Sequence, residues 1–193
     1  ISGNVSFYNE TNGEGIYPTP AIGGVGLIKD LSNTMTISLK KEGSYICVIG
    51  SSSNHLGNSQ YLSIIKNKEI GNTPLIDLDE ELKNGKFVLN CIEQNRFEAV
   101  HDIADGGLLI ALAEMSIYGK KGVKLEVNKP SLVEYLFGED QSRYLVEISK
   151  DNFEEVLLGA KKNKVSVEKI GLTQADQFEI KNIGKIKVED GYI

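Results

Sequence analysis

This 193-residue chain contains no tryptophan, two histidines and two cysteines. His55 and His101 are too few for a multi-histidine metal centre within these residues. Cys47 and Cys91 lie in apolar segments, which favours buried free thiols over a disulfide and fits a reducing cytoplasm. No stretch approaches the ~20 apolar residues that a membrane span needs, and nothing resembles a signal peptide. We therefore expect a cytoplasmic protein that does not bind membranes.

Three common motifs are also missing. The sequence has no G-x-x-x-x-G-K-[ST] loop, no G-x-G-x-x-G after a strand and no G-x-S-x-G elbow. These absences argue against P-loop, Rossmann and α/β-hydrolase chemistry. The net charge of −6 argues against nucleic acid as the main partner.

What is present is the composition of an ordinary globular protein, 40% hydrophobic and 25% charged. Residues 1–30 form one predicted unit: an apolar residue runs into a Ser-Gly-Asn turn, prolines stiffen residues 17–20, and residues 21–28 are predicted to form a buried strand. Because the sequence starts directly in this turn, we expect the chain to be a piece of a larger protein.

Residues 37–193 alternate between strand and helix patterns and predict an α/β (α+β) domain. The expected helices cover 56–66, with Leu56, Tyr61, Ile64 and Ile65 as its apolar face, and 79–94, with Leu82, Val88, Leu89 and Ile92. Further helices are expected over 106–118, 131–136 and 152–162. Strands are expected over 44–50, 97–101, 123–127, 144–148, 165–172, 177–180 and 185–189.

The N-terminal turn offers the first set of functional groups. Gly3 lets main-chain N–H groups approach a phosphate, Asn4 offers an amide oxygen to a hard cation such as Mg²⁺, and Ser6 offers a hydroxyl to a phosphate or sugar. In an extended strand the side chains of Asn4 and Ser6 lie on the same face. The alternative is a Gly-Asn turn with surface polar residues.

A second set lies between a strand and the helix over 106–118. The sequence His101-Asp102-Ile103-Ala104-Asp105-Gly106-Gly107 places carboxylates beside a helix N-terminus, where anions bind and carboxylates can hold the accompanying cation. The alternative is that Asp105 is the helix N-cap, Asp102 a turn residue and His101 a structural residue.

A third segment, residues 137–144, contains Glu139, Asp140 and Arg143 in an acidic turn before a strand. We expect this turn to be solvated, with any ion pair of Arg143 contributing little.

Five segments in a fixed order resemble the phosphoribosylformylglycinamidine synthase family in its shorter, multi-subunit form. They are ISGNVSFYNET, IYPTPAIGGVGLIKD, HLGNSQYL, HDIADGGLLIALAEMS and FGEDQSRYLV, which span most of the chain up to residue 148. The resemblance implies the tail of a second ATP-binding domain over residues 1–30. It also implies a C-terminal domain of the aminoimidazole ribonucleotide synthetase type over residues 37–193, with a mixed sheet and flanking helices.

The family's reaction is an ATP-dependent ligation that uses glutamine as the amide donor. It converts formylglycinamide ribonucleotide, glutamine and ATP to formylglycinamidine ribonucleotide, glutamate, ADP and phosphate. Matched by motif, Gly3 contacts ATP, Asn4 binds Mg²⁺ and Ser6 contacts the ribonucleotide substrate. Asp102 matches a Mg²⁺ ligand of an auxiliary nucleotide site in larger relatives, but Ala104 replaces the serine more usual there and weakens that assignment.

The resemblance also implies that no catalytic residue lies in this chain, because the family's catalytic histidine belongs to the N-terminal half. We therefore expect the chain alone to be inactive. The implied partners are that missing half, a glutaminase subunit and a small accessory subunit, and an open strand edge near residue 30 favours pairing with a second copy. Two rival functions are another ATP-dependent enzyme of the same superfamily and a non-catalytic docking module for the glutaminase and accessory subunits.

Overall fold

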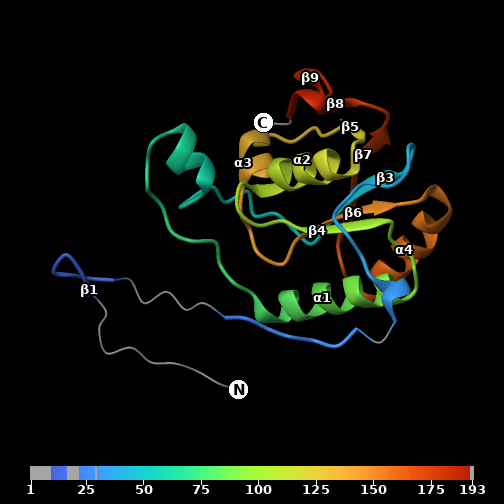
Figure 1. Cartoon of the computed structure of the whole chain (residues 1–193), viewed down its shortest axis with the longest axis horizontal. Helices are drawn as coiled ribbons and strands as arrows, with labels where there is room; N and C mark the ends of the chain where they lie inside the picture. The colour runs from blue at the N-terminus through green and yellow to red at the C-terminus, as the bar shows by residue number, and fades with distance from the viewer. Residues whose placement is uncertain (1–9, 17–21, 29, 192–193) are drawn as a thin grey trace. The chain divides into compact units, whose positions relative to one another are not determined.

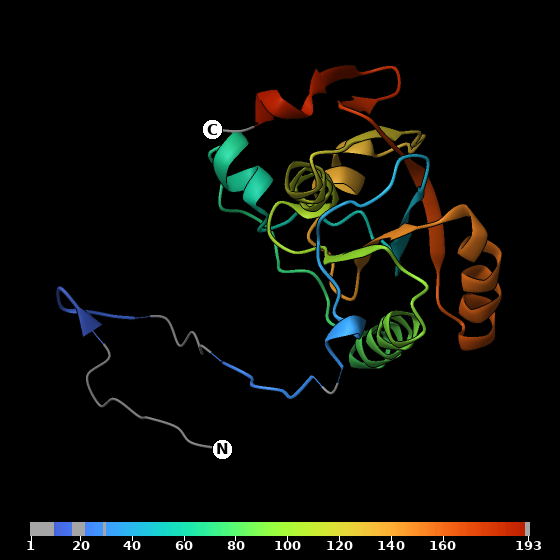
Figure 2. The same cartoon turned by 45° about the vertical axis from the view of Figure 1, so that its right-hand side comes forward.

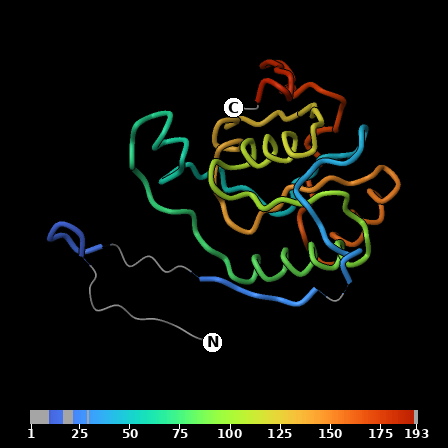
Figure 3. The backbone as a smooth tube through the Cα atoms, viewed as in Figure 1, coloured from blue at the N-terminus to red at the C-terminus, as the bar shows by residue number. Residues whose placement is uncertain are grey.

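The computed structural model describes residues 10–16, 22–28 and 30–191. They fall into two units, Ile1–Leu31 and Ser32–Ile193, which we describe separately. Figure 3 follows the backbone through the larger unit, whose strands form one sheet. The predicted turn at Gly3, Asn4 and Ser6 lies outside the described residues.

The sheet of the larger unit has seven strands in the order β4-β6-β3-β7-β5-β8-β9. Neighbouring strands are antiparallel except β5 and β8, which are parallel, so the sheet is mixed. The strands are β3 Tyr45–Ile49, β4 Ala99–Asp102, β5 Gly122–Leu125, β6 Tyr144–Ile148, β7 Val167–Gln174, β8 Gln177–Ile180 and β9 Gly184–Lys187.

Helices cover both faces of this sheet (Figures 1 and 2). On one face lie α2 (Gly107–Gly119) and α3 (Leu132–Phe137), and on the other lie α1 (Leu78–Glu93) and α4 (Lys150–Asn163). Each pair of helices closes a separate hydrophobic core against the sheet. The predicted mixed sheet with flanking helices is confirmed.

Strand β3 shows why the sheet is buried on both sides. Its side chains alternate: Ile46 and Val48 pack into the core beneath α2, while Cys47 and Ile49 pack into the core beneath α1 and α4. A strand with two buried faces needs a continuous apolar run, and YICVI supplies one. The predicted buried, free thiols at Cys47 and Cys91 are confirmed.

Two predicted helices differ in detail. In place of a helix over 56–66 there is a π-helix, Tyr61–Ile65, in which Ile64 and Ile65 are exposed. In α1 the buried residues are Asn84, Phe87, Val88 and Cys91, whereas the predicted Leu82 and Leu89 are exposed. The apolar periodicity located both helical segments and the buried Val88, but it misplaced Leu82, Leu89, Ile64 and Ile65.

In the smaller unit, a two-residue turn joins β1 (Glu10–Thr11) to β2 (Glu14–Gly15) in a β-hairpin. The turn residues Asn12 and Gly13 have φ values of 55° and 80°. Asn-Gly is the sequence best suited to such a turn, because both central residues need positive φ. This hairpin was not predicted from the sequence.

The predicted buried strand over residues 21–28 is wrong for the residues that the structure describes. Residues 22–28 adopt no strand, and Val25 and Leu27 are fully exposed. A strand needs a partner for its main-chain N–H and C=O groups, and no described segment pairs with this one. Apolar composition alone therefore misled the prediction.

Two smaller structural elements complete the described fold. One 3₁₀ turn, Leu31–Asn33, includes the first residues of the larger unit, and another, Val188–Gly191, follows β9. Among the described residues, no helix has the length and apolar character needed to cross a membrane.

A buried carboxylate ties the segment before β3 to the sheet. Glu147 on β6 is fully buried and accepts hydrogen bonds from the main-chain N–H groups of Lys40, at 2.7 Å, and Lys41, at 2.9 Å. A buried charge is tolerated when hydrogen bonds replace its lost hydration. Glu147 is therefore a structural anchor within an otherwise apolar layer.

We predict that Glu147→Gln lowers the free energy of unfolding by about 1–3 kcal/mol, because the new NH₂ group cannot accept one of the two N–H donors. The matched control is Glu98→Gln, which removes the partly exposed ion pair of Glu98 with Lys41 and should cost less than about 1 kcal/mol. Urea unfolding of both variants measures the difference. Equal losses in the two variants would contradict the anchoring role.

We also predict that the two thiols are protected and make stability depend on pH. Burial raises the pKa of Cys47 to about 12 and that of Cys91 to about 11. The thiols of the unfolded chain have a pKa of ~8.5. At pH values between this pKa and the raised native pKa values, the native state holds more protons than the unfolded state. The free energy of unfolding therefore falls as pH rises. The check is slow reaction with Ellman's reagent before denaturation and rapid reaction after it. We also expect the free energy of unfolding to decline between about pH 8 and pH 10, and to decline less in Cys91→Ala than in the parent chain.

Candidate functional site

Of the residues predicted to bind ligands, the structure describes only Asp102, at the end of β4. Its carboxylate is exposed and contacts Nδ1 of His101 at 3.0 Å. The other ring nitrogen, Nε2, lies 3.0 Å from a carboxylate oxygen of Glu114 on α2. Because both ring nitrogens are engaged, His101 links β4 to α2, as expected of a structural residue.

The start of α2 is capped differently from the prediction. Gly106, not Asp105, occupies the N-cap position, with a φ of 82°. A Cβ atom there would lie 2.6 Å from Cγ1 of Ile110, so only glycine fits. The N–H of Gly106 donates to Oε1 of Glu139 at 2.8 Å. A carboxylate of the chain itself therefore occupies the position where we expected an external anion.

Glu139 and its neighbour Asp140 connect several loops. The same Oε1 of Glu139 accepts a second hydrogen bond, from the N–H of Gln60, at 2.8 Å. Asp140 is buried and accepts hydrogen bonds from the hydroxyls of Ser52, at 2.9 Å, and Ser53. We call these two acidic residues the Glu139–Asp140 clamp, because they hold together the serine loop (residues 51–53, after β3), the π-helix and α2.

The expectation of a solvated acidic turn over 137–144 is therefore wrong. Arg143 is also buried; its Nε donates to the carbonyl of Asp140 at 3.3 Å, and its Nη2 donates to the carbonyl of Gly138 at 2.5 Å. Burial lowers the pKa of Arg143, and the neighbouring Asp140 opposes this effect. The Arg143 guanidinium thus fixes the main chain of the turn that carries Glu139 and Asp140.

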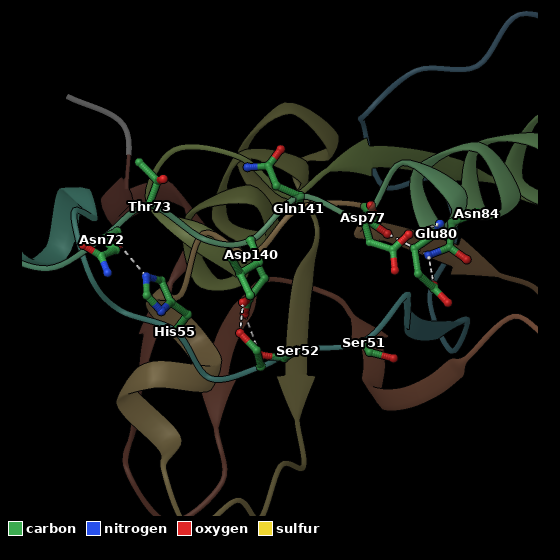
Figure 4. Close-up of a pocket in the computed structure, with 13 residues that line it drawn as sticks. Ser51, Ser52, His55, Asn72, Thr73, Asp77, Glu80, Asn84, Asp140 and Gln141 are labelled. Carbon is green, nitrogen blue, oxygen red and sulfur yellow. Dashed lines mark hydrogen bonds between the residues drawn. The ribbon is translucent and has the colours of Figure 1, made fainter.

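An open cavity of about 520 Å³, lined mostly by residues with polar side chains, lies beside this clamp (Figure 4). His55 and Asn72 stand at one end, Glu80 and Asn84 at the other, and Asp140 and Ser52 between them. Nε2 of His55 is held 2.6 Å from the carbonyl of Asn72. The lining also contains Ser51, Ser53, Thr73, Leu75, Asp77, Gln141 and Ser142.

The cavity was not predicted from the sequence. Its walls come from the Gly-Ser-Ser-Ser turn after β3, the loop before α1, the first turns of α1 and the clamp. The serine run after a strand and the acidic turn were both visible in the sequence, but nothing in their local pattern showed that they meet.

The described residues alone do not fit a Mg²⁺ site. Among them, no group of three or more His, Cys, Asp or Glu side chains is placed to hold a metal ion. The Asp102 carboxylate contacts the ring of His101, and an imidazole is a poor ligand for Mg²⁺, which prefers oxygen. A cation at Asp102 would therefore need ligands from outside the described part of the chain.

Comparison with known families identifies residues 41–181 as an AIR synthase related protein, C-terminal domain. The chain is 43% identical over 192 residues to the phosphoribosylformylglycinamidine synthase subunit PurL of Pelagibacter ubique. That match covers 98% of the chain and 26% of the relative, so the chain spans about a quarter of its relative's length. The resemblance seen in the five sequence segments is confirmed.

Solved structures show the same fold. PurL of Thermotoga maritima in complex with FGAR matches with a TM-score of 0.68 at 17% identity, covering 82% of this chain and 29% of that one. The structure of its ATP complex matches with a TM-score of 0.63 at 18% identity, and the PurLQS structure with a TM-score of 0.65 at 17% identity. Each of these two matches covers 82% of this chain and 27% of the other chain. A thiamine-monophosphate kinase from Stenotrophomonas maltophilia also matches, with a TM-score of 0.55 at 14% identity. That match covers 76% of this chain and 52% of the kinase chain.

We predict that Glu139→Ala destabilises the larger unit by about 1–3 kcal/mol, because it leaves the N–H groups of Gly106 and Gln60 without their acceptor. Glu139→Gln keeps an acceptor oxygen and should recover at least half of this loss. Thermal and urea unfolding measure both effects. A Glu139→Gln variant as unstable as Glu139→Ala would show that the charge, and not the shared acceptor, is what matters.

Proposed function

We propose, from the premise that this chain belongs to the family of AIR synthase related proteins, that it forms part of a phosphoribosylformylglycinamidine synthase subunit of the PurL type. The observation that carries the proposal is the 43% identity to PurL over 98% of the chain. The likeness to a thiamine-monophosphate kinase, at 14% identity, supports only a shared fold. For this reason we rank another ATP-dependent enzyme of the superfamily below PurL.

The activity that we propose for the whole protein is the conversion of formylglycinamide ribonucleotide, glutamine and ATP to formylglycinamidine ribonucleotide, glutamate, ADP and phosphate. The complexes of the Thermotoga maritima protein with FGAR and with ATP support this choice of ligands. The catalytic histidine belongs, in this proposal, to the three quarters of the relatives that the chain does not match.

Within the chain, we assign the N-terminal turn to the ligand site. Gly3 contacts ATP through its main chain, Asn4 is a Mg²⁺ ligand and Ser6 contacts the ribonucleotide. Asp102 is the weaker candidate for Mg²⁺, since its carboxylate contacts the ring of His101 and belongs to no metal-binding cluster among the described residues. These roles rest on the motif match ISGNVSFYNET.

We further propose that the chain works in an assembly with a glutaminase subunit and a small accessory subunit. The PurLQS structure of Thermotoga maritima supports the existence of such an assembly in a relative. The free, buried thiols suit a reducing compartment, in keeping with the cytoplasm. Pairing with a second copy through the smaller unit is also part of the proposal. The rival function is a purely docking role, and an activity test distinguishes it from the enzyme function.

The test uses a chimera in which this chain replaces the matching quarter of Pelagibacter ubique PurL. We predict that the chimera forms ADP and phosphate from ATP in the presence of formylglycinamide ribonucleotide, ammonia and Mg²⁺, and that the 193-residue chain alone does not. In the chimera, Asn4→Ala should lower kcat/KM by about 10- to 100-fold or more, because a metal ligand is lost.

The control variant is Asn128→Ala, which removes an amide outside the N-terminal turn and should leave kcat/KM unchanged. An Asn4→Ala chimera with full activity would overturn the assigned role of the turn. Turnover by the chain alone would refute the placement of the catalytic residues. A folded chimera that assembles with the partner subunits but never forms ADP would favour the docking role.

A further inference from the structure

The cavity beside the Glu139–Asp140 clamp has no part in the function proposed above. We propose that it binds an uncharged, hydroxyl-rich ligand of about the size of a ribose or a nucleoside. The inference is independent of the N-terminal turn, because every lining residue lies between Ser51 and Ser142 in the larger unit. The volume of about 520 Å³ is within the range of small-molecule sites, about 300–1,000 Å³.

Several polar groups in the lining have no partner among the described residues. They include the hydroxyls of Ser51 and Thr73, the side-chain amide of Asn72 and Nδ1 of His55. Hydroxyls and amides both donate and accept hydrogen bonds, as a ligand with several hydroxyl groups requires. The clamp binds Ser52 and Ser53, so this part of the cavity wall is held in place before a ligand arrives.

The charge of the lining decides against a phosphate. The carboxylates of Asp77, Glu80 and Asp140 line the cavity, and no lysine or arginine does. Glu80 is paired with Lys83, and Asp140 is satisfied by serine hydroxyls with Arg143 close behind it. An anionic group would meet carboxylates without a compensating cation in the lining.

Asp77 is the carboxylate best placed to accept a ligand hydroxyl. Its Oδ1 caps α1 by accepting the N–H groups of Asp79 and Glu80, each at 3.0 Å, while Oδ2 has no described partner. Acidic side chains bind ribose hydroxyls in nucleotide sites for the same reason, since an ionised carboxylate only accepts. The exposed side chain of Leu75 supplies an apolar surface for the carbon skeleton.

The experiment titrates the ¹⁵N-labelled 193-residue chain with adenosine, with methyl β-D-ribofuranoside and with inorganic phosphate, followed by NMR. We expect saturable shifts at amides of residues 51–55, 72–77 and 140–142 with adenosine and with the riboside, and none there with phosphate. Asp77→Asn keeps the helix cap but turns the free acceptor into a donor, and should weaken binding about tenfold or more. Thr73→Val should weaken it about two- to tenfold.

Two matched controls lie outside the cavity, Asp79→Asn in the same helical turn and Thr11→Val in the hairpin, and both should bind like the parent chain. Thermal unfolding establishes that all four variants are folded. The proposal is overturned if neither adenosine nor the riboside gives saturable shifts, if phosphate binds at these residues, or if Asp79→Asn weakens binding as much as Asp77→Asn. Binding of adenosine without the riboside would also overturn it, because the hydroxyl groups would then not carry recognition.

Discussion

The arrangement of the larger unit's loops depends on one pair of buried and half-buried carboxylates. Glu139 binds the N–H groups that begin α2 and the π-helix, while Asp140 binds the serine loop that follows β3. Arg143 fixes the main chain of the same turn through the carbonyls of Gly138 and Asp140. Hydrogen bonds to charged groups are among the stronger ones, and each of these replaces hydration lost on burial. Removing the clamp would therefore free the serine loop, the π-helix and the start of α2 at once.

Much of the fold of the larger unit follows from local sequence patterns. The run YICVI predicts a strand, and the leucine- and alanine-rich segment after Gly106 predicts a helix; both are present. The clamp is not predictable in this way, because its partners are distant in sequence. Ser52 lies 88 residues from Asp140, and Gln60 lies 79 residues from Glu139. Local periodicity carries no information about such pairs, so a turn that looked solvated proved to be buried.

The error at residues 22–28 has a related cause. Strand propensity measures how well a side chain fits a pleated, half-buried surface, and the surface itself must come from a partner. Val25 and Leu27 have strand-like composition, yet they are exposed in the part of the chain that the structure describes. In the relatives, the matched region is only about a quarter of a longer polypeptide. Strand-like composition therefore does not by itself make a strand.

The same dependence on distant partners bears on what can bind beside α2. A helix N-terminus attracts anions, and Gly106-Gly107 in this position first suggested a phosphate site. Glu139 already occupies the N–H of Gly106, and the N–H of Gly107 donates to the carbonyl of Ala104 at 3.0 Å. Ala104 itself offers no hydroxyl. A phosphate here would have to displace a carboxylate that also holds the π-helix. A helix N-terminus whose N–H groups are already bound within the chain is therefore a poor site for a phosphate, whatever its glycines suggest.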